Sequence, residues 1–269
     1  MTRSGARQAQ SPRVPAPRLP VVFDDGVRRM LATVPESAAV ELKVTVPDSD
    51  RRPVMAALGV DPLDAEIRQV AFVDTPDLAV LGAGVVVRVR RTQHGAGDLV
   101  VKVRSIGPDA FPDELGGQHG LGVEVDVSQT RLGCAATLRT ELSDRRAKEL
   151  LSSRLTIADV ASAAQQALLS ERVADQLARD DLAVHGPIHV LKRKFLPSGL
   201  EHRLVAELWF LPDGSRTFEL STTCTPSGAL QVAGEIKQFL ARHGVDLDAR
   251  KDSRARSALT ALVAGSERP

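Results

Sequence analysis

Aromatic side chains are scarce in this chain of 269 residues, which contains seven phenylalanines, one tryptophan and no tyrosine. Modules that bind single-stranded nucleic acid stack its bases on aromatic rings, and this composition offers few of them. The charges also nearly cancel, because 35 lysines and arginines face 34 aspartates and glutamates. Such a chain has no overall cationic field to attract nucleic acid. We therefore expect no sequence-specific nucleic-acid binding.

Cysteines and long apolar runs are equally scarce. Cys134 and Cys224 are far apart and lack CxxC spacing, so neither a disulfide framework nor a structural zinc site is expected. The apolar runs are much shorter than the roughly twenty residues of a membrane-spanning helix. Residues 1–20 combine arginines and prolines without an apolar segment, which predicts a disordered tail and excludes a secretory signal peptide. We expect a cytoplasmic protein with no membrane partner and a single domain over residues 21–269.

Short segments in which apolar and charged residues alternate dominate the rest of the chain. Side chains in a β-strand point alternately to the two faces of the sheet, so this pattern predicts strands with one apolar and one charged face. Eight such strands are enough to close a small antiparallel barrel of the α+β class. The segments are residues 38–46, 67–73, 85–91, 99–104, 121–127, 190–195, 202–210 and 216–223.

Helical patterns interrupt the strands. A short helix is expected at residues 53–58, and residues 139–182 predict two or three helices inserted between strands. A further helix begins after Thr225-Pro226 and ends at Gly244, and a last one covers residues 253–263. The apolar stripes of these helices would cover the apolar strand faces, which places the helices on the outside of the barrel. Gly82-Ala83-Gly84 predicts a turn, and the segment from His185 to His189 predicts a loop.

The charged strand faces have two interpretations. An antiparallel sheet with one solvated face also alternates apolar and charged residues. Here, however, the charges are grouped by sign, which favours a lumen with a basic wall and an acidic wall. Such a lumen would suit a polyphosphate bound to a divalent cation. The basic set is Arg88, Arg90, Lys102, Arg104, Lys192 and Lys194, and the acidic set is Glu41, Glu124, Asp126, Glu207 and Glu219.

The segment Val40-Glu41-Leu42-Lys43 and the block from Phe72 to Leu81 resemble two motifs of the CYTH, or triphosphate tunnel metalloenzyme, family. Val40-Glu41-Leu42-Lys43 is similar to the latter part of that family's ExExK strand. The block from Phe72 to Leu81, FVDTPDLAVL, is followed at the expected distance by Arg88-Val89-Arg90 and by Lys102. The resemblance covers about residues 37–260. It implies an eight-stranded antiparallel tunnel and membership of a family that includes inorganic, thiamine and RNA triphosphatases and class IV adenylate cyclases.

The resemblance also implies roles for individual residues. A Mg²⁺ or Mn²⁺ ion would be bound by Glu41, Glu124, Asp126 and Glu219, and the catalytic residues would be Lys43 and Glu41. Phosphate oxygens would be bound by Lys43, Arg88, Arg90, Lys102, Arg104, Lys192 and Lys194. The sequence departs from the family pattern at two positions, because Ala39 replaces the first glutamate of ExExK and Ser221 stands where a second carboxylate would follow Glu219.

Three functions follow as hypotheses. The first is a metal-dependent triphosphatase that hydrolyses a phosphoanhydride of a triphosphate or polyphosphate, with a class IV adenylate cyclase-like activity on a nucleotide-like substrate as a variant. The second is a noncatalytic module that binds polyphosphate or a phosphorylated ligand, which the substitutions at Ala39 and Ser221 favour. The third is a plain sheet protein whose charged faces point to water.

Overall fold

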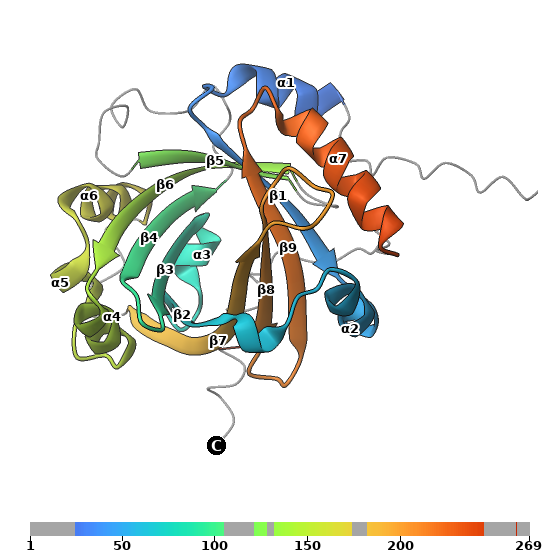
Figure 1. Ribbon diagram of the computed structural model, residues 1–269. Coiled ribbons are helices and arrows are strands. Elements are labelled where there is room, and N and C mark those ends of the chain that lie inside the picture. Colours follow the sequence, from blue (N-terminus) through green and yellow to red (C-terminus); the bar gives the residue numbers. More distant parts are fainter. Residues whose placement is uncertain (1–24, 105–120, 128–131, 174–181, 245–261, 263–269) are drawn as a thin grey trace, which may run out of the picture.

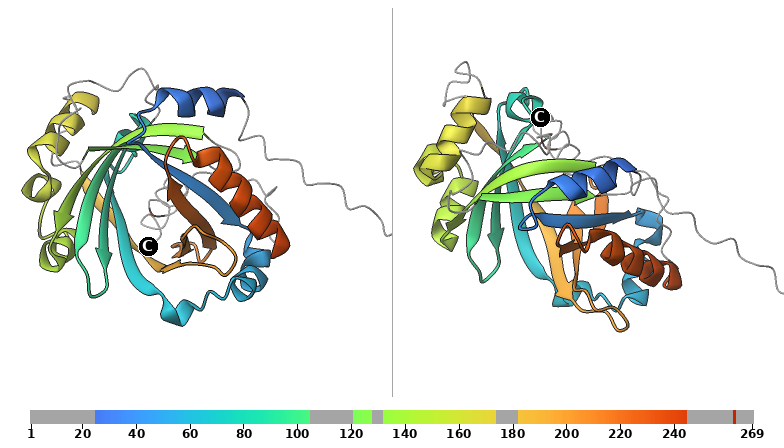
Figure 2. Two further views of the ribbon diagram at one scale, coloured as in Figure 1. Left: turned by 45° about the horizontal axis from the view of Figure 1, so that its top comes forward. Right: turned by 90° about the horizontal axis from the view of Figure 1, so that it is seen from above.

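The computed structural model describes residues 25–104, 121–127, 132–173, 182–244 and Leu262, and the tail predicted at residues 1–20 lies outside these ranges. Nine strands close into one barrel in the order β1-β5-β6-β4-β3-β2-β7-β8-β9 (Figures 1 and 2). The prediction of a closed barrel is confirmed. The strands are β1 Ala39–Val46, β2 Glu66–Asp74, β3 Val85–Thr92, β4 Gly97–Arg104, β5 Leu121–Val127, β6 Leu132–Leu142, β7 Ala183–Phe195, β8 Leu204–Phe210 and β9 Arg216–Cys224.

The ninth strand is β6, where the sequence analysis is wrong. The alanines of this segment, followed by Arg139 and Glu141, favour a helix by intrinsic propensity. Pairing with β4 on one side and β5 on the other overrides that propensity, so Arg139 lies in a strand. A ring with an odd number of strands cannot be antiparallel throughout. The parallel pair is β1 with β5, and this pair corrects the prediction of a fully antiparallel tunnel.

Six of the described helices lie outside the barrel in two groups (Figure 1). The inserted helices α4, α5 and α6 lie beside β3, β4 and β6, and α1, α2 and α7 lie on the side of β1 and β9. The insertion contains three helices, as predicted, but begins after β6. The helix expected at residues 253–263 lies outside the described residues except for Leu262. The bounds are α1 Asp25–Thr33, α2 Asp48–Ala57, η2 Pro62–Asp64, α3 Ala79–Gly82, α4 Asp144–Leu151, α5 Ile157–Val160, α6 Ala163–Arg172 and α7 Ala229–Arg242.

The hydrophobic core lies mainly between the barrel and these helices. On one side, Leu150 and Leu168 pack with the outward-facing valines of β3, which are Val85, Val87 and Val89, and with Leu99 and Leu138. On the other side, α2 and α7 pack against the apolar residues of β1, β8 and β9. Because these apolar faces point outward under the helices, the alternate residues of each strand point into the barrel. The hypothesis of a sheet with its charged faces in water is therefore wrong.

A third apolar cluster lies inside the barrel. It contains the inward-facing side chains of Phe72, Val86, Ile188 and Trp209. Leu81 is buried in the same cluster, and Leu262 packs against it. Phe72 and Ile188 are each 1% exposed. This cluster fills one part of the lumen with apolar side chains and leaves the charged residues of the same strands around the remaining space.

The block from Phe72 to Leu81 shapes that apolar cluster. The carboxylate of Asp74 accepts hydrogen bonds from the backbone N–H groups of Thr75, Val80 and Leu81 at 2.8, 2.9 and 3.0 Å. Burial raises the pKa of Asp74, and the three backbone hydrogen bonds act against that rise. The aspartate thus fixes the short helix α3 and directs Leu81 into the cluster.

Helices α4 and α6 hold the strands of one wall in place. Gln165 is completely buried, and its Nε2 donates to the carbonyl oxygens of Leu99 on β4 and Leu138 on β6, both at 3.0 Å. Nearby, Gly97 lies so close to α4 that a Cβ at this position would be 2.5 Å from the Cβ of Ala147 and 2.7 Å from the carbonyl oxygen of Arg90.

We predict that Gly97→Ala destabilises the protein by about 1–3 kcal/mol, the usual cost of forcing extra volume into a packed site. The free energy of unfolding, measured by urea titration, checks this. Gly133→Ala is the matched control. Gly133 lies on β6 of the same barrel, and a Cβ at this position would have no neighbouring atom within 4 Å. An equal effect of the two substitutions would contradict the close packing of α4 on Gly97.

Candidate functional site

The charged inner faces enclose a cavity of about 980 Å³. Its basic lining residues come from six strands, and its acidic residues come from four. The basic residues are Lys43, Arg68, Arg88, Arg90, Lys102, Arg139, Lys192 and Lys194, and the acidic residues are Glu41, Glu124, Glu141 and Glu207. Eight basic groups against four acidic groups give the described lining a surplus of four positive charges.

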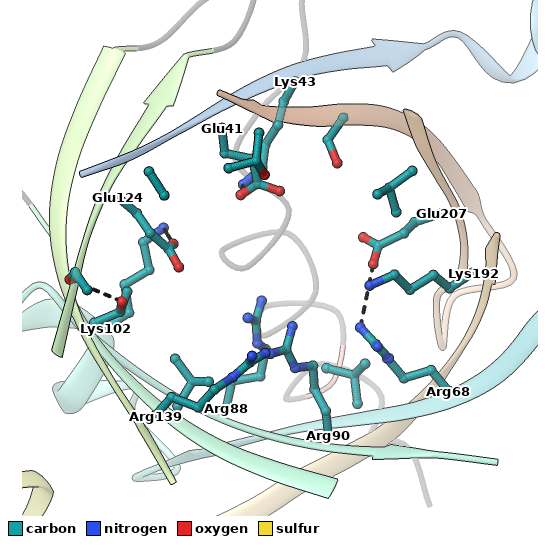
Figure 3. Close-up of a pocket in the computed structure, with 18 of the residues that line it drawn as sticks. Glu41, Lys43, Arg68, Arg88, Arg90, Lys102, Glu124, Arg139, Lys192 and Glu207 are labelled. Carbon is teal, nitrogen blue, oxygen red and sulfur yellow. Dashed lines mark hydrogen bonds and ion pairs between the residues drawn. The ribbon is translucent and has the colours of Figure 1, made fainter. Parts of the chain in front are cut away.

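Figure 3 shows the labelled charged residues in three groups around the cavity. The first group joins β1 to β5 and β4. Here Lys43 Nζ lies 2.6 Å from Glu41 Oε2, and Lys102 Nζ lies 2.9 Å from Glu124 Oε2. Both glutamates therefore contact a lysine, and both lysines also face the cavity.

The second group consists of arginines. Arg88 and Arg90 come from β3, and Arg139 comes from β6 on the far side of β4 (Figure 3). Asp98 on β4 lies between them. Its two carboxylate oxygens accept from Arg90 Nε and Nη2 at 2.7 and 2.6 Å, and Arg139 Nη2 lies 2.7 Å from Asp98 Oδ2. Burial opposes ionisation of this carboxyl, but the hydrogen bonds and charges of the arginines hold the pKa of Asp98 below its ordinary value.

The third group contains Arg68, Lys192 and Glu207 (Figure 3). Arg68 Nη1 lies 3.8 Å from Glu207 Oε1, and Lys192 is the register partner of Glu207. Burial, followed by the charge of Arg68, lowers the pKa of Lys192 to about 8, although Glu207 acts in the opposite direction. Burial and the charge of Arg90 also lower the pKa of Arg68. This wall therefore lacks enough negative charge to balance its cations.

Most of the residues proposed from the sequence meet in this cavity. The lining includes Glu41, Lys43, Arg88, Arg90, Lys102, Glu124, Lys192 and Lys194. Three others do not belong to the described lining. Arg104 lies at the end of β4, where its backbone N–H donates to Gly84. Glu219 is 4% exposed and lies opposite Glu207, beyond Ser221 and Thr223, which do line the cavity. The side chain of Asp126 lies outside the described residues.

The sequence analysis missed four charged residues, namely Arg68, Arg139 and Glu141 of the lining and Asp98, which contacts two of the arginines. Glu207, which it placed in the acidic wall without an individual role, does line the cavity. Arg68 alternates with Val70 and Phe72, so its inward position follows from the strand pattern that was already recognised. Arg139 was assigned to a helix. Asp98 directly precedes the segment expected as a strand, and only the register of β3, β4 and β6 places it between Arg90 and Arg139.

The described side chains do not form a group of three His, Cys, Asp or Glu residues that could hold a metal ion. They do offer Glu41 and Glu124 on neighbouring strands, facing the same cavity. Mg²⁺ usually retains several waters and is bound by one or two carboxylates together with substrate phosphates. This donor set therefore fits a cation that is bound jointly with a phosphate ligand, and it does not fit a separate protein cage.

No family model matches the sequence, and no curated protein matches it. Solved structures do match the fold. A putative adenylyl cyclase from Hippeastrum, described as having a dominant triphosphatase activity, aligns with a TM-score of 0.59 and 14% identity over 82% of this chain and 94% of that chain. A putative adenylate cyclase from Bacillus halodurans aligns with a TM-score of 0.57 and 12% identity over 82% and 97%.

These similarities show that the chain has the CYTH-type fold of the triphosphate tunnel proteins. The eleven-residue strand β6 adds one strand to the eight that the resemblance implied. None of the helices within the described ranges has the length and apolar character needed to cross a bilayer.

The low pKa of Lys192 predicts a specific pH dependence of stability. The unfolded chain keeps the lysine proton up to about pH 10.4, whereas the folded protein releases it near pH 8. Between these values the unfolded state binds more protons, so stability rises with pH. We expect the free energy of unfolding of the wild type to rise relative to Lys192→Met from pH 8 to pH 10, measured by urea titration. Lys192→Arg, which stays charged, should show no such rise. If stability changed with pH in the same way in the wild type and in Lys192→Met, the low pKa of Lys192 would be contradicted.

Proposed function

We propose that the barrel cavity binds a triphosphate or polyphosphate and hydrolyses one of its phosphoanhydride bonds. The observation that supports this most strongly is the convergence of eight lysines and arginines from six strands on one cavity. Arginine forks and lysine ammonium groups form strong, charge-assisted hydrogen bonds with phosphate oxygens. A linear polyphosphate carries several phosphates in a row, so it can contact more than one of the charged groups around the cavity in Figure 3.

In this proposal the basic side chains bind the phosphate chain and fix the phosphorus that reacts. Arg88, Arg90 and Arg139 would hold one part of the chain, and Lys192 and Lys194 another. Lys43 and Glu41 are the proposed catalytic residues, because they contact each other at the cavity wall where a terminal phosphate could meet both. Glu41 and Glu124 would hold Mg²⁺ or Mn²⁺ together with the phosphates. When bound, such an ion stabilises the charge that develops on the transferred phosphoryl group.

A second candidate is a noncatalytic polyphosphate-binding module. Glu41 and Glu124 each contact a lysine, while Ala39, Ser221 and Thr223 line the cavity with no carboxylate. A cavity of this composition binds anions even where its metal affinity is too weak for turnover.

We also propose a cytoplasmic location, which the two free thiols Cys134 and Cys224 support. We further propose that residues 21–269 form a single domain.

The proposal predicts that tripolyphosphate changes the fluorescence of Trp209, the single tryptophan, which lines the cavity.

Arg88→Ala should weaken tripolyphosphate binding by about 10- to 100-fold, because a hydrogen bond to a charged group contributes roughly 1.5–3 kcal/mol. Calorimetric titration gives the dissociation constants. Arg145→Ala is the control, since Arg145 lies on α4 with its side chain 82% exposed. No binding to the wild-type protein, or equal losses in both variants, would contradict the proposal.

Turnover separates the enzyme from the binding module. Phosphate release from tripolyphosphate with Mg²⁺ or Mn²⁺, lost in Lys43→Ala and in Glu124→Ala, is expected for the enzyme. Tight binding that needs no metal and gives no phosphate release would identify the binding module instead. With ATP as the substrate, release of pyrophosphate in place of phosphate would indicate the cyclase-type reaction.

A further inference from the structure

Asp98 occupies a particular position among the arginines of the cavity. It lies on β4 directly opposite Arg90 of β3. On the other side, Asp98 pairs with Glu141 of β6, and Arg139 lies two residues before Glu141 on the same strand. The carboxylate binds Arg90 through both oxygens and contacts Arg139 through one of them. A single acidic side chain therefore links guanidinium groups from the strands on both sides of its own.

This linkage restricts two side chains that would otherwise be flexible. Long side chains such as arginine lose rotamer freedom when they are ordered, and a ligand that must order them binds more weakly. The bidentate contact uses Nε and Nη2 of Arg90 and leaves Nη1 for another partner. The side chain of Arg139 is 55% exposed although its tip contacts Asp98, whose side chain is 15% exposed.

We propose that Asp98 is a positioning residue that holds Arg90 and Arg139 in the orientation that binds the phosphate chain. This inference depends on the proposed function, because it assigns Asp98 to the same polyphosphate site. Asp98 itself carries a negative charge and would repel the ligand. Its contribution is the geometry of the two arginines.

A neighbouring glutamate provides a matched comparison. Glu141 on β6 is the register partner of Asp98 and also lines the cavity. Among the described residues Glu141 forms no ion pair, and its side chain is exposed. Neutralising either residue therefore removes one negative charge from the same part of the barrel wall, but only the change at Asp98 affects the arginine contacts.

The experiment compares Asp98→Asn with Glu141→Gln, using tripolyphosphate as the probe and calorimetry as the measurement. If charge alone acted, both variants would bind more tightly than the wild type. We expect Asp98→Asn to bind about tenfold more weakly, and Glu141→Gln to bind as tightly as the wild type or more tightly. Equal or tighter binding by Asp98→Asn would overturn the inference.

A second measurement separates positioning from a general loss of structure. In a chain that already carries Arg90→Ala and Arg139→Ala, Asp98→Asn should no longer weaken binding, because there is no guanidinium left to position. A weakening as large as in the wild-type background would overturn the inference.

Two further controls cover folding and the proposed function. If Asp98→Asn no longer unfolds cooperatively, Asp98→Glu is tested in its place. This change keeps the negative charge, so an effect of charge alone predicts unchanged affinity for tripolyphosphate. A positioning role predicts a several-fold loss of affinity. Unchanged affinity of Asp98→Glu would then overturn the inference. Absence of tripolyphosphate binding in the wild type would overturn both the inference and the proposed function, whereas wild-type binding with a tighter Asp98→Asn would overturn the inference alone.

Discussion

Mutual repulsion among basic side chains is the constraint on which the rest of this structure depends. A closed barrel directs every second residue of each strand into a confined space, and here eight of those residues are lysine or arginine. Like charges that share a partly desolvated cavity raise each other's free energy. Two responses are visible: lysines contact Glu41 and Glu124, and arginines contact Asp98 and Glu207. At Lys192, burial and then the charge of Arg68 lower the pKa to about 8.

The position of the hydrophobic core follows from the same constraint. Because the lumen is reserved for charged groups, most apolar strand residues must be buried on the outside, and helices on two sides of the barrel provide the cover. Inside the barrel, the cluster around Phe72 and Trp209 gathers apolar side chains on one part of the lumen. Gln165 of α6 binds the wall that carries Asp98, and Gly97 belongs to that wall, so the packing of α4 and α6 also fixes the strands that carry the arginines.

Strand alternation made much of this fold predictable from the sequence. The alternation in β1, β3 and the second half of β7 identified both the strands and the side chains that share the cavity, because a period of two is a local property. The segment from His185 to His189, which was expected as a loop, lies in the first half of β7. Strand β6 was not predictable in this way, since its alanines and Arg139 favour a helix and only pairing with β4 and β5 makes it a strand. Asp98 depends on register between three strands, which no local pattern encodes. The depth of a residue along the barrel is equally non-local, and this is why Glu219 and Ser221, two residues apart on one face, differ in their access to the cavity.

The surplus of positive charge bears on the kind of ligand that this cavity fits. The chain as a whole is almost neutral, with 35 basic and 34 acidic residues, yet the described lining has four more basic than acidic groups. A monophosphate, which near neutral pH carries no more than about two negative charges, would leave part of that surplus unbalanced. A triphosphate supplies several more charges along an extended chain and could meet the arginines and Lys192 at the same time. Each carboxylate that binds a cation joined to the phosphates would release its lysine toward the ligand, so metal and phosphate binding would support each other at the contacts of Glu41 with Lys43 and of Glu124 with Lys102.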